Sequence, residues 1–278
     1  MTEIGEGNTG RTLELPGIHE GRITLAWAAV TDVGRRRQAN EDSYIAAPPI
    51  FAVADGMGGH LAGDLASAAV VNRLSELAGP PVGSMDQIVK SLADASNDIA
   101  IVAGDSDIGV GTTVTGAVLT EVDGKPFFAV FNIGDSRVYQ FEGNELAQVT
   151  TDHSLVQELV DSGLLTRAQA YQHPEGNIIT RAVGFEENPI PDYTLVAVRT
   201  GLRLLVCSDG LTGELRDDRV RLHFAAGLSP SETANALVDA ALAAGGRDNV
   251  TVIVIDVIEG PDAPDLDDTA PDARYGTR

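Results

Sequence analysis

Four aspartates that are far apart in the chain each stand at one end of an apolar run, beside a glycine or an asparagine. They are Asp55 in FAVADG, Asp135 in FAVFNIGD, Asp209 in LRLLVCSDG and Asp248 in DNVTVIVI. Apolar runs of this kind predict buried strands, and an acid just past a strand end lies at the rim of a sheet. If the fold brings these rims together, the four carboxylates cannot all stay ionised unless a cation neutralises them. Carboxylate oxygens suit a hard divalent ion such as Mg²⁺ or Mn²⁺, so the pattern predicts a metal site assembled from distant segments.

Composition and charge restrict the class of protein. The chain has 278 residues, 43% of them hydrophobic, which is enough for a folded core and argues against overall disorder. Its formal charge of −22 disfavours binding to nucleic acid or to an anionic membrane. A single cysteine, Cys207, excludes an internal disulfide and fits a reducing compartment. A membrane span is not expected, because no apolar run approaches roughly 20 residues, and neither is a signal peptide, because the N-terminus lacks the apolar region that one needs. We therefore expect a cytoplasmic protein that acts as a monomer.

The apolar patterns predict one folded domain at 22–258, preceded by a flexible leader at 1–21 and followed by a disordered acidic tail at 259–278. Helical periodicity is clear at 66–77 and 85–102, and Ser229-Pro-Ser-Glu232 is typical of a helix start. Shorter helical pieces are expected after Asp152 and Thr166, and 163–184 as a surface flap. The strands outnumber the helices and follow one another, which favours an α+β fold with packed sheets. The expected strands are 23–30, 50–54, 111–121, 126–133, 136–141, 192–198, 202–208 and 250–257.

The segment DGMGGH at 55–60 is the strongest local element. Asp55 supplies a carboxylate, and the glycines at 56, 58 and 59 let the backbone approach a ligand, so that a carbonyl can also coordinate. It is neither a dinucleotide fingerprint nor a Walker motif. Taken alone, it is equally typical of an ordinary strand-to-helix turn.

The other acidic and basic segments are weak signals one by one. Arg37, followed by Asn40-Glu41-Asp42, can present a planar fork to a phosphate, but an arginine cluster next to acids is more often a solvated surface. The motifs around Asp135, Asp209 and Asp248 could each be a plain turn. The five histidines show no zinc-ligand spacing, although His60, His153 and His173 lie in or near candidate site segments. Cys207 lies inside an apolar strand, which favours packing over reactivity.

Taken together and in this order, RxxNEDS, DGMGGHxxG, GTT, GDSR, DHS, HPxxNxxTR, SDG and RDN resemble the metal-dependent serine/threonine protein phosphatases of type 2C, and most of all their compact bacterial members. The resemblance covers about Thr24 to Val257. It implies a four-layer αββα sandwich with a centre of two, or three, Mn²⁺ or Mg²⁺ ions at one end of two mainly antiparallel sheets.

The resemblance also implies a role for each matching residue. Asp55 would bridge two ions and the Gly56 carbonyl would bind one, with Asp209 and Asp248 completing the second ion's shell. Asp135 would hold a third ion together with Asp209. Three further residues would act around the ions: Glu41 and Asp42 in the network of bound water, and Arg37 on the substrate phosphate.

One position departs from part of the family. Some members carry a histidine two residues after the first aspartate, where this chain has Met57. The proton donor to the leaving group therefore stays open between His60 and a metal-bound water.

The implied reaction is hydrolysis of phosphoserine and phosphothreonine in proteins, by a metal-activated water that attacks phosphorus in line. Two alternatives stay open: a phosphatase of small phosphate esters, and a signalling module that binds phosphoproteins without hydrolysing them. A calcium-binding structural protein fits the acidity, but not the arginine or the flap.

Overall fold

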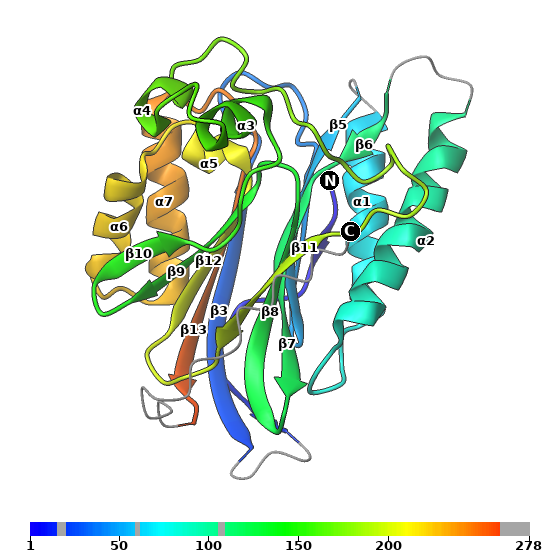
Figure 1. Ribbon diagram of the computed structural model, residues 1–278. Coiled ribbons are helices and arrows are strands. Elements are labelled where there is room, and N and C mark those ends of the chain that lie inside the picture. Colours follow the sequence, from blue (N-terminus) through cyan, green and yellow to red (C-terminus); the bar gives the residue numbers. More distant parts are fainter. Residues whose placement is uncertain (16–20, 59–61, 105–108, 262–278) are drawn as a thin grey trace.

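The computed structural model describes residues 1–15, 21–58, 62–104 and 109–261. They form four layers, in which two sheets pack face to face and helices cover both outer faces (Figure 1). This arrangement confirms the predicted α+β sandwich.

The first sheet is mixed. Its order is β1 (Glu3–Ile4), β4 (Asp42–Ala47), β5 (Ile50–Met57), β7 (Val114–Val122), β8 (Lys125–Ile133) and β11 (Asp192–Ala197), and the short β6 (Gly111–Thr112) pairs with the end of β5. The pair β1–β4 is parallel, and the other pairs are antiparallel. The helices α1 (Ala62–Ser75) and α2 (Met85–Ala103) cover its outer face.

The second sheet is antiparallel throughout. Its order is β10 (Glu145–Gln148), β9 (Arg137–Glu142), β12 (Arg203–Cys207), β13 (Val250–Glu259), β3 (Arg22–Asp32) and β2 (Asn8–Glu14). On its outer face lie α5 (Asp209–Thr212), α6 (Asp217–Ala225) and α7 (Pro230–Ala244). Two short helices, α3 (Leu155–Asp161) and α4 (Arg167–Ala170), belong to the segment at the upper end of the sandwich in Figure 1.

Three apolar layers hold the four structural layers together. Trp27 and Phe51 meet edge to face between the sheets, with ring centroids 5.6 Å apart. Along β5, Phe51 and Val53 enter this central layer, whereas Ile50 and Ala52 pack under α1 and α2. Both faces of such a strand are buried, which explains why its sequence is continuously apolar rather than alternating.

The beginning of the chain differs from the expected flexible leader. Residues 8–14 form the edge strand β2 on β3, residues 3–4 form β1 on β4, and Leu13 and Leu15 are buried. The indole N–H of Trp27 also donates to the Glu6 carbonyl, at 3.0 Å. These strands depend on main-chain pairing with distant partners, which hydrophobic periodicity does not register. Residue 259 ends β13 instead of beginning a tail, and residues 262–278 lie outside the described part.

The helix predictions are confirmed for the three long helices and for the two short ones after Asp152 and Thr166. At the start of α7 the Ser229 hydroxyl accepts from the Glu232 amide at 3.3 Å, and the Glu232 carboxylate accepts from the Ser229 amide, so the capping box is present. Helix α6 and strand β4 were not predicted. In the residues described, no helix is both long and apolar enough to span a membrane.

Candidate metal centre

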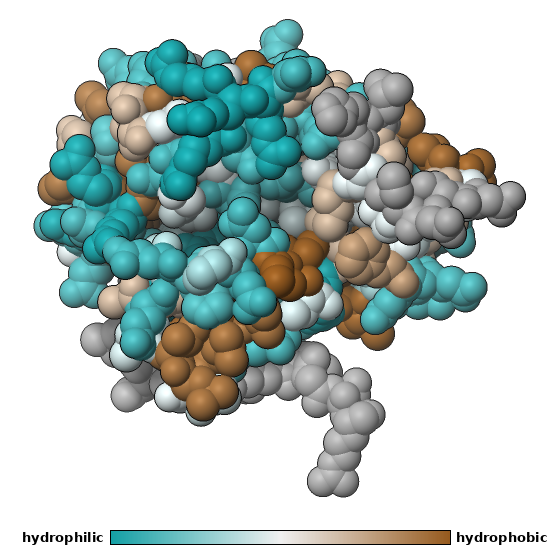
Figure 2. Space-filling view, turned by 90° about the horizontal axis from the view of Figure 1, so that it is seen from above, coloured by the Kyte–Doolittle hydropathy of each residue, from teal (hydrophilic) through white to brown (hydrophobic). Residues whose placement is uncertain are grey.

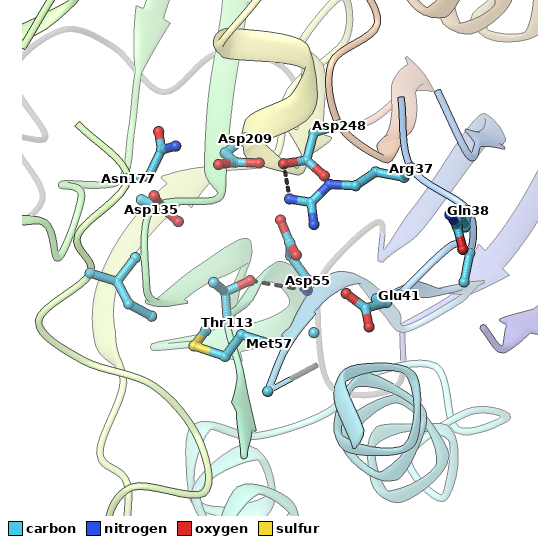
Figure 3. A pocket seen from close by; sticks show the side chains of 14 residues that line it. Arg37, Gln38, Glu41, Asp55, Met57, Thr113, Asp135, Asn177, Asp209 and Asp248 are labelled. Carbon is cyan, nitrogen blue, oxygen red and sulfur yellow. Dashed lines mark hydrogen bonds and ion pairs between the residues drawn. The ribbon is translucent and has the colours of Figure 1, made fainter. Parts of the chain in front are cut away.

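The four aspartates singled out in the sequence line one cavity at the end of the sandwich. The cavity has a volume of about 340 Å³, enough for a phosphate group and bound ions, since a water occupies about 30 Å³. Figure 3 shows the side chains of Asp55, Asp135, Asp209 and Asp248 pointing toward one another. The other lining residues are Arg37, Gln38, Ala39, Glu41, Gly56, Met57, Gly58, Thr113, Asn177 and Ile179.

Both sheets contribute to this cavity. Asp55 ends β5, and Asp135 follows β8 in the same sheet. In the other sheet, Asp209 begins α5 directly after β12, and Asp248 precedes β13. Because the two sheets pack face to face, strand ends from both meet at one rim. The structure thus brings together residues that are up to about two hundred positions apart in the chain.

Two glycines make this convergence possible. A Cβ on Gly210 would lie 1.8 Å from the Asn249 carbonyl oxygen, so glycine lets the segment after Asp209 lie directly on the segment after Asp248. A Cβ on Gly56 would lie 2.0 Å from the Gly63 carbonyl oxygen, where α1 begins against the end of β5. Close main-chain contact, rather than side-chain packing, therefore sets the spacing of the acids.

The site is crowded with negative charge. Enclosure by protein, followed by the charges of Asp42 and Asp209, raises the pKa of Asp55 well above its usual range. The same enclosure raises the pKa of Asp135, with Asp209 adding to it, and that of Asp209, with Asp248 adding to it. Such carboxylates hold protons unless a cation compensates them.

Several carboxylate oxygens near the cavity also lack a hydrogen-bond partner. Among the residues described, these enclosed oxygens include Glu41 Oε1, Asp42 Oδ1 and Asp209 Oδ1. Native proteins rarely leave such oxygens unpaired. Oxygen atoms of this kind are the ligands that Mg²⁺ and Mn²⁺ prefer, so the residues fit a divalent metal centre.

Arg37 reaches the cavity, but here it contacts an acid. Its Nη2 lies 2.6 Å from Oδ2 of Asp248, and this hydrogen bond raises the Arg37 pKa further. In the described part of the chain, no three acidic, histidine or cysteine side chains stand close enough to hold one ion directly. The ligand set, and the phosphate-binding role of Arg37, accordingly stay predictions.

The side chains of Glu41 and Asp42 lie in different places although the residues are neighbours, because successive side chains along a strand point to opposite sides. Glu41 lines the cavity, whereas Asp42 is fully buried behind it and does not line it. Its Oδ2 accepts hydrogen bonds from Ser208 Oγ at 2.9 Å and Thr251 Oγ at 2.6 Å. The geometry therefore does not favour a direct role for Asp42 in a network of bound water. Burial raises its pKa to about 7.

Asp42 leads to a prediction about pH. Its pKa in the folded state exceeds the usual 3.8, so folding is favoured by protonation, and its contribution to stability falls as the pH rises from about 4 to about 7. In chelator, Asp42→Asn should be more stable than the parent at pH 8, and the gain should shrink toward pH 5. Urea unfolding at both pH values measures this, and an equal effect at both would contradict it.

The candidate histidines have separate outcomes. His60, the proposed proton donor, lies outside the described residues. His153 is tied to the main chain beside Asp135, since its Nδ1 accepts from the Gly134 amide at 3.1 Å. His173 lines a neighbouring cavity. The sequence reasoning assigned no role to Thr113, although its hydroxyl accepts from the Asp55 amide at 3.1 Å; the GTT motif was the available signal.

A second cavity, of about 620 Å³, adjoins the first. The two share Asp135, Asn177, Asp209 and Asp248, and the second runs between the flap and the segment from α5 to α6. Figure 2, which views this end of the molecule from above, shows mainly hydrophilic residues around the hollowed middle of the face. The site therefore continues into an open polar groove.

Comparisons with known proteins agree with this geometry. The sequence profile of the family described as "Protein phosphatase 2C" matches residues 35–244. The serine/threonine protein phosphatase PstP of Mycobacterium tuberculosis is 39% identical over 243 residues, which are 85% of this chain and 46% of PstP. The serine/threonine phosphatase stp of Listeria welshimeri is 36% identical over 239 residues, 81% of this chain and 93% of the relative. The chain thus spans about half the length of the mycobacterial relatives it matches.

Solved structures agree as well. The crystal structure of the M. tuberculosis phosphatase PstP/Ppp superposes with a TM-score of 0.77 at 36% identity, covering 84% of this chain and 98% of that one. The catalytic domain of PstP in complex with two manganese ions gives a TM-score of 0.76 at 36% identity, covering 84% and 99%. The profile match over most of the chain, these identities and the shared architecture lead to one conclusion. The chain belongs to the protein phosphatase 2C family.

Proposed function

We propose that this chain hydrolyses phosphoserine and phosphothreonine in proteins, at a centre of two Mn²⁺ or Mg²⁺ ions. The observation that carries the proposal is the meeting of four aspartates, from both sheets, around one cavity. Membership of the protein phosphatase 2C family, and the two manganese ions of the relative's structure, support it.

The residues that would hold the ions are Asp55 with the Gly56 carbonyl on one side, and Asp209 with Asp248 on the other. When bound, the ions would lower the pKa of a water and neutralise charge on the phosphoryl group. The chain itself would contribute the fixed spacing of these ligands, since the close contacts of Gly56 and Gly210 hold them on rigid elements. Glu41, at the cavity wall, would accept a hydrogen bond from water. The proton donor stays a prediction, with His60 as one candidate.

Arg37 would bind the substrate phosphate. Its side chain is 49% exposed at the cavity and already holds an anionic oxygen of Asp248, so exchange of that oxygen for a phosphoryl oxygen needs only a local movement.

Arg37→Ala should therefore raise the KM for a phosphopeptide by about 10- to 100-fold, the equivalent of a lost charge-assisted contact of about 1.5–3 kcal/mol, and leave Mn²⁺ affinity nearly unchanged. Arg36→Ala is the matched control, because Arg36 is exposed and does not line the cavity. Steady-state kinetics and calorimetry measure the two quantities. Weaker Mn²⁺ binding with an unaltered KM would assign Arg37 to the charge cluster alone.

The shape of the site favours a polypeptide over a small ester. A phosphoryl group fits the inner cavity, whereas the adjoining groove, of about 620 Å³, offers polar side chains to residues beside the phosphorylated one. A non-catalytic binding module is disfavoured, since all the expected acids are present. The partners would be proteins phosphorylated on serine or threonine, and the buried Cys207, whose pKa burial raises to about 12, fits a reducing, cytoplasmic setting without a catalytic role.

The decisive test is hydrolysis of a phosphothreonine peptide and of p-nitrophenyl phosphate, first with Mn²⁺ and then with a chelator. We expect metal-dependent turnover with a higher kcat/KM for the peptide. Turnover that survives the chelator would overturn the metal mechanism, and a preference for the small ester would favour the alternative substrate class.

Asp135 would hold a third, weaker ion together with Asp209. Both line the inner cavity and the groove, and the charge of Asp209 contributes to the raised pKa of Asp135. A site with few protein ligands binds its ion loosely and keeps most of its waters.

Asp135→Ala should thus lower turnover about tenfold or more while two ions still bind tightly, because the loss of partner groups around a metal costs about 10- to 100-fold. Calorimetric stoichiometry and phosphopeptide turnover are the measurements. Unchanged activity together with unchanged stoichiometry would show that Asp135 is a turn residue only.

A further inference from the structure

A series of hydrogen bonds links Thr2, the residue before β1, to the wall of the metal centre. The Thr2 amide donates to Ser43 Oγ at 2.9 Å, Ser43 Oγ lies 3.0 Å from Ser67 Oγ, and Ser67 Oγ donates to the Glu41 carbonyl at 2.6 Å. Ser43 and Ser67 are 1% and 0% exposed, so water does not compete for these bonds. These hydrogen bonds, which we call the relay, connect the start of β1 with β4 and α1 inside the protein.

The direction of the relay follows from the number of protons. Ser67 has a single hydroxyl proton, and both of its other contacts, the carbonyls of Glu41 and Asp64, can only accept. Ser43 must then donate to Ser67, and it in turn accepts the Thr2 amide. The Ser67 proton is directed mainly at the nearer carbonyl, that of Glu41 at 2.6 Å, because the Asp64 carbonyl is 3.2 Å away.

The relay ends at the residue where the two halves of the site meet. The Glu41 amide donates to Oδ1 of Asn249 at 2.8 Å, next to Asp248. The Glu41 carbonyl also accepts from the Gly56 amide at 3.3 Å. On the other side, a Cβ on Gly63 would lie 3.1 Å from Cδ of Glu41, so glycine at this position lets the start of α1 lie close to the glutamate.

The first strand anchors the outer end of the relay. β1 pairs in parallel with β4, with Glu3 opposite Tyr44, and the Tyr44 amide donates to the Thr2 carbonyl at 3.0 Å. The Tyr44 hydroxyl donates to Glu3 Oε2 at 3.0 Å. In Figure 1 the N-terminus lies close to α1 and β5, in agreement with these contacts. β1 itself lies outside residues 35–244, which match the family profile.

We infer that β1 holds part of the metal centre in place. The relay from the Thr2 amide through Ser43 and Ser67 positions the main chain of Glu41, and thereby the main chain of Gly56 and the Glu41 carboxylate. Ser43 and Ser67 are positioning residues, because they touch neither the cavity nor a substrate. The inference rests on the proposed metal-dependent function. Groups that orient metal ligands from behind change metal affinity by about 10- to 100-fold when they are removed.

The first experiment compares Ser67→Ala with Ser96→Ala by calorimetric titration of the folded apo-protein with Mn²⁺. Ser96 is the matched control: it too is a buried helical serine whose hydroxyl donates to a main-chain carbonyl, that of Glu186 at 2.7 Å, and it does not line the cavity. We expect Mn²⁺ affinity to fall about tenfold or more in Ser67→Ala and to stay within about twofold of the parent in Ser96→Ala. Equal affinities in the two variants would overturn the relay.

The second experiment tests the strand itself and does not depend on whether Ser67→Ala folds. Thr2→Pro removes the amide donor and the threonine side chain and fixes φ, whereas Thr2→Ala removes the side chain but keeps the donor. We expect Thr2→Pro to bind Mn²⁺ several-fold more weakly than Thr2→Ala. Equal binding would overturn the role of β1.

Failure of the proposed function and failure of the relay give different results. If the unaltered protein neither binds Mn²⁺ nor hydrolyses phosphopeptide, the proposed function is wrong and the inference falls with it. If the unaltered protein does both while the two pairs of variants show no difference, only the relay is wrong.

Discussion

Asp209→Asn is expected to reduce phosphopeptide turnover by about a thousandfold or more, at the upper end of what one charge-stabilising group contributes. Asp209 lines both cavities and begins α5, where its Oδ1 has no hydrogen-bond partner among the described residues. An amide cannot offset the charge of a divalent ion, so the ligand is lost even though the shape is retained. Asp55→Asn, at the opposite wall, should have the same effect.

The fold should survive this change. Asp209→Asn removes one of the carboxylates whose pKa values are raised by burial and then by mutual repulsion, so the apo-protein should be as stable as the parent or more stable. Asp218→Asn, at an exposed position of α6, is the matched control for both measurements. Wild-type turnover of Asp209→Asn at saturating Mn²⁺ would show that the proposed site is wrong.

Gly210→Ala should have the largest effect on stability, a loss of about 3 kcal/mol or more. The added Cβ would lie 1.8 Å from the Asn249 carbonyl oxygen and 2.9 Å from its carbonyl carbon, both of which are backbone and cannot rotate away. The segments that carry Asp209 and Asp248 would then have to separate. We therefore expect weaker Mn²⁺ binding as well as a lower urea midpoint.

Gly10→Ala is the control for that substitution. Its nearest neighbours would be side-chain atoms 3.9 and 4.0 Å away, and Gly10 lies on the exposed strand β2. Urea unfolding should show a change within about 0.5 kcal/mol there, as is usual for surface positions. If Gly210→Ala unfolded at the same urea concentration as Gly10→Ala, close main-chain contact could not be what sets the spacing of the acids.

Much of the architecture could be predicted because buried strands and helices have recognisable local sequence patterns. β5 and β13 are buried on both faces, so their sequences are continuously apolar and identify them without knowledge of their neighbours. The capping box before α7 is local in the same way, since its bonds join residues three apart. The acids at strand ends could be listed for the same reason.

Other features have no local sequence pattern that would predict them. β1 is short and β2 is mostly polar, and both exist because β4 and β3 offer them main-chain partners. The motif order predicts both Glu41 and Asp42 in the network of bound water, yet the pleat places Glu41 in the cavity wall and Asp42 in the core. The contact of Arg37 with Asp248 joins residues 211 positions apart.

The sequence by itself determined the class of fold, the set of acids and the family, because apolar periodicity and motif order are properties of neighbouring residues. Only the tertiary structure decided which acids face the cavity, that Arg37 contacts Asp248, and which hydrogen bonds support the cavity wall from behind. These depend on how two sheets meet: Gly210 lies on Asn249, and the relay from Thr2 reaches Glu41 only because β4 and α1 bring Ser43 and Ser67 within 3.0 Å of each other. Such contacts depend on distances in space that no spacing along the chain encodes.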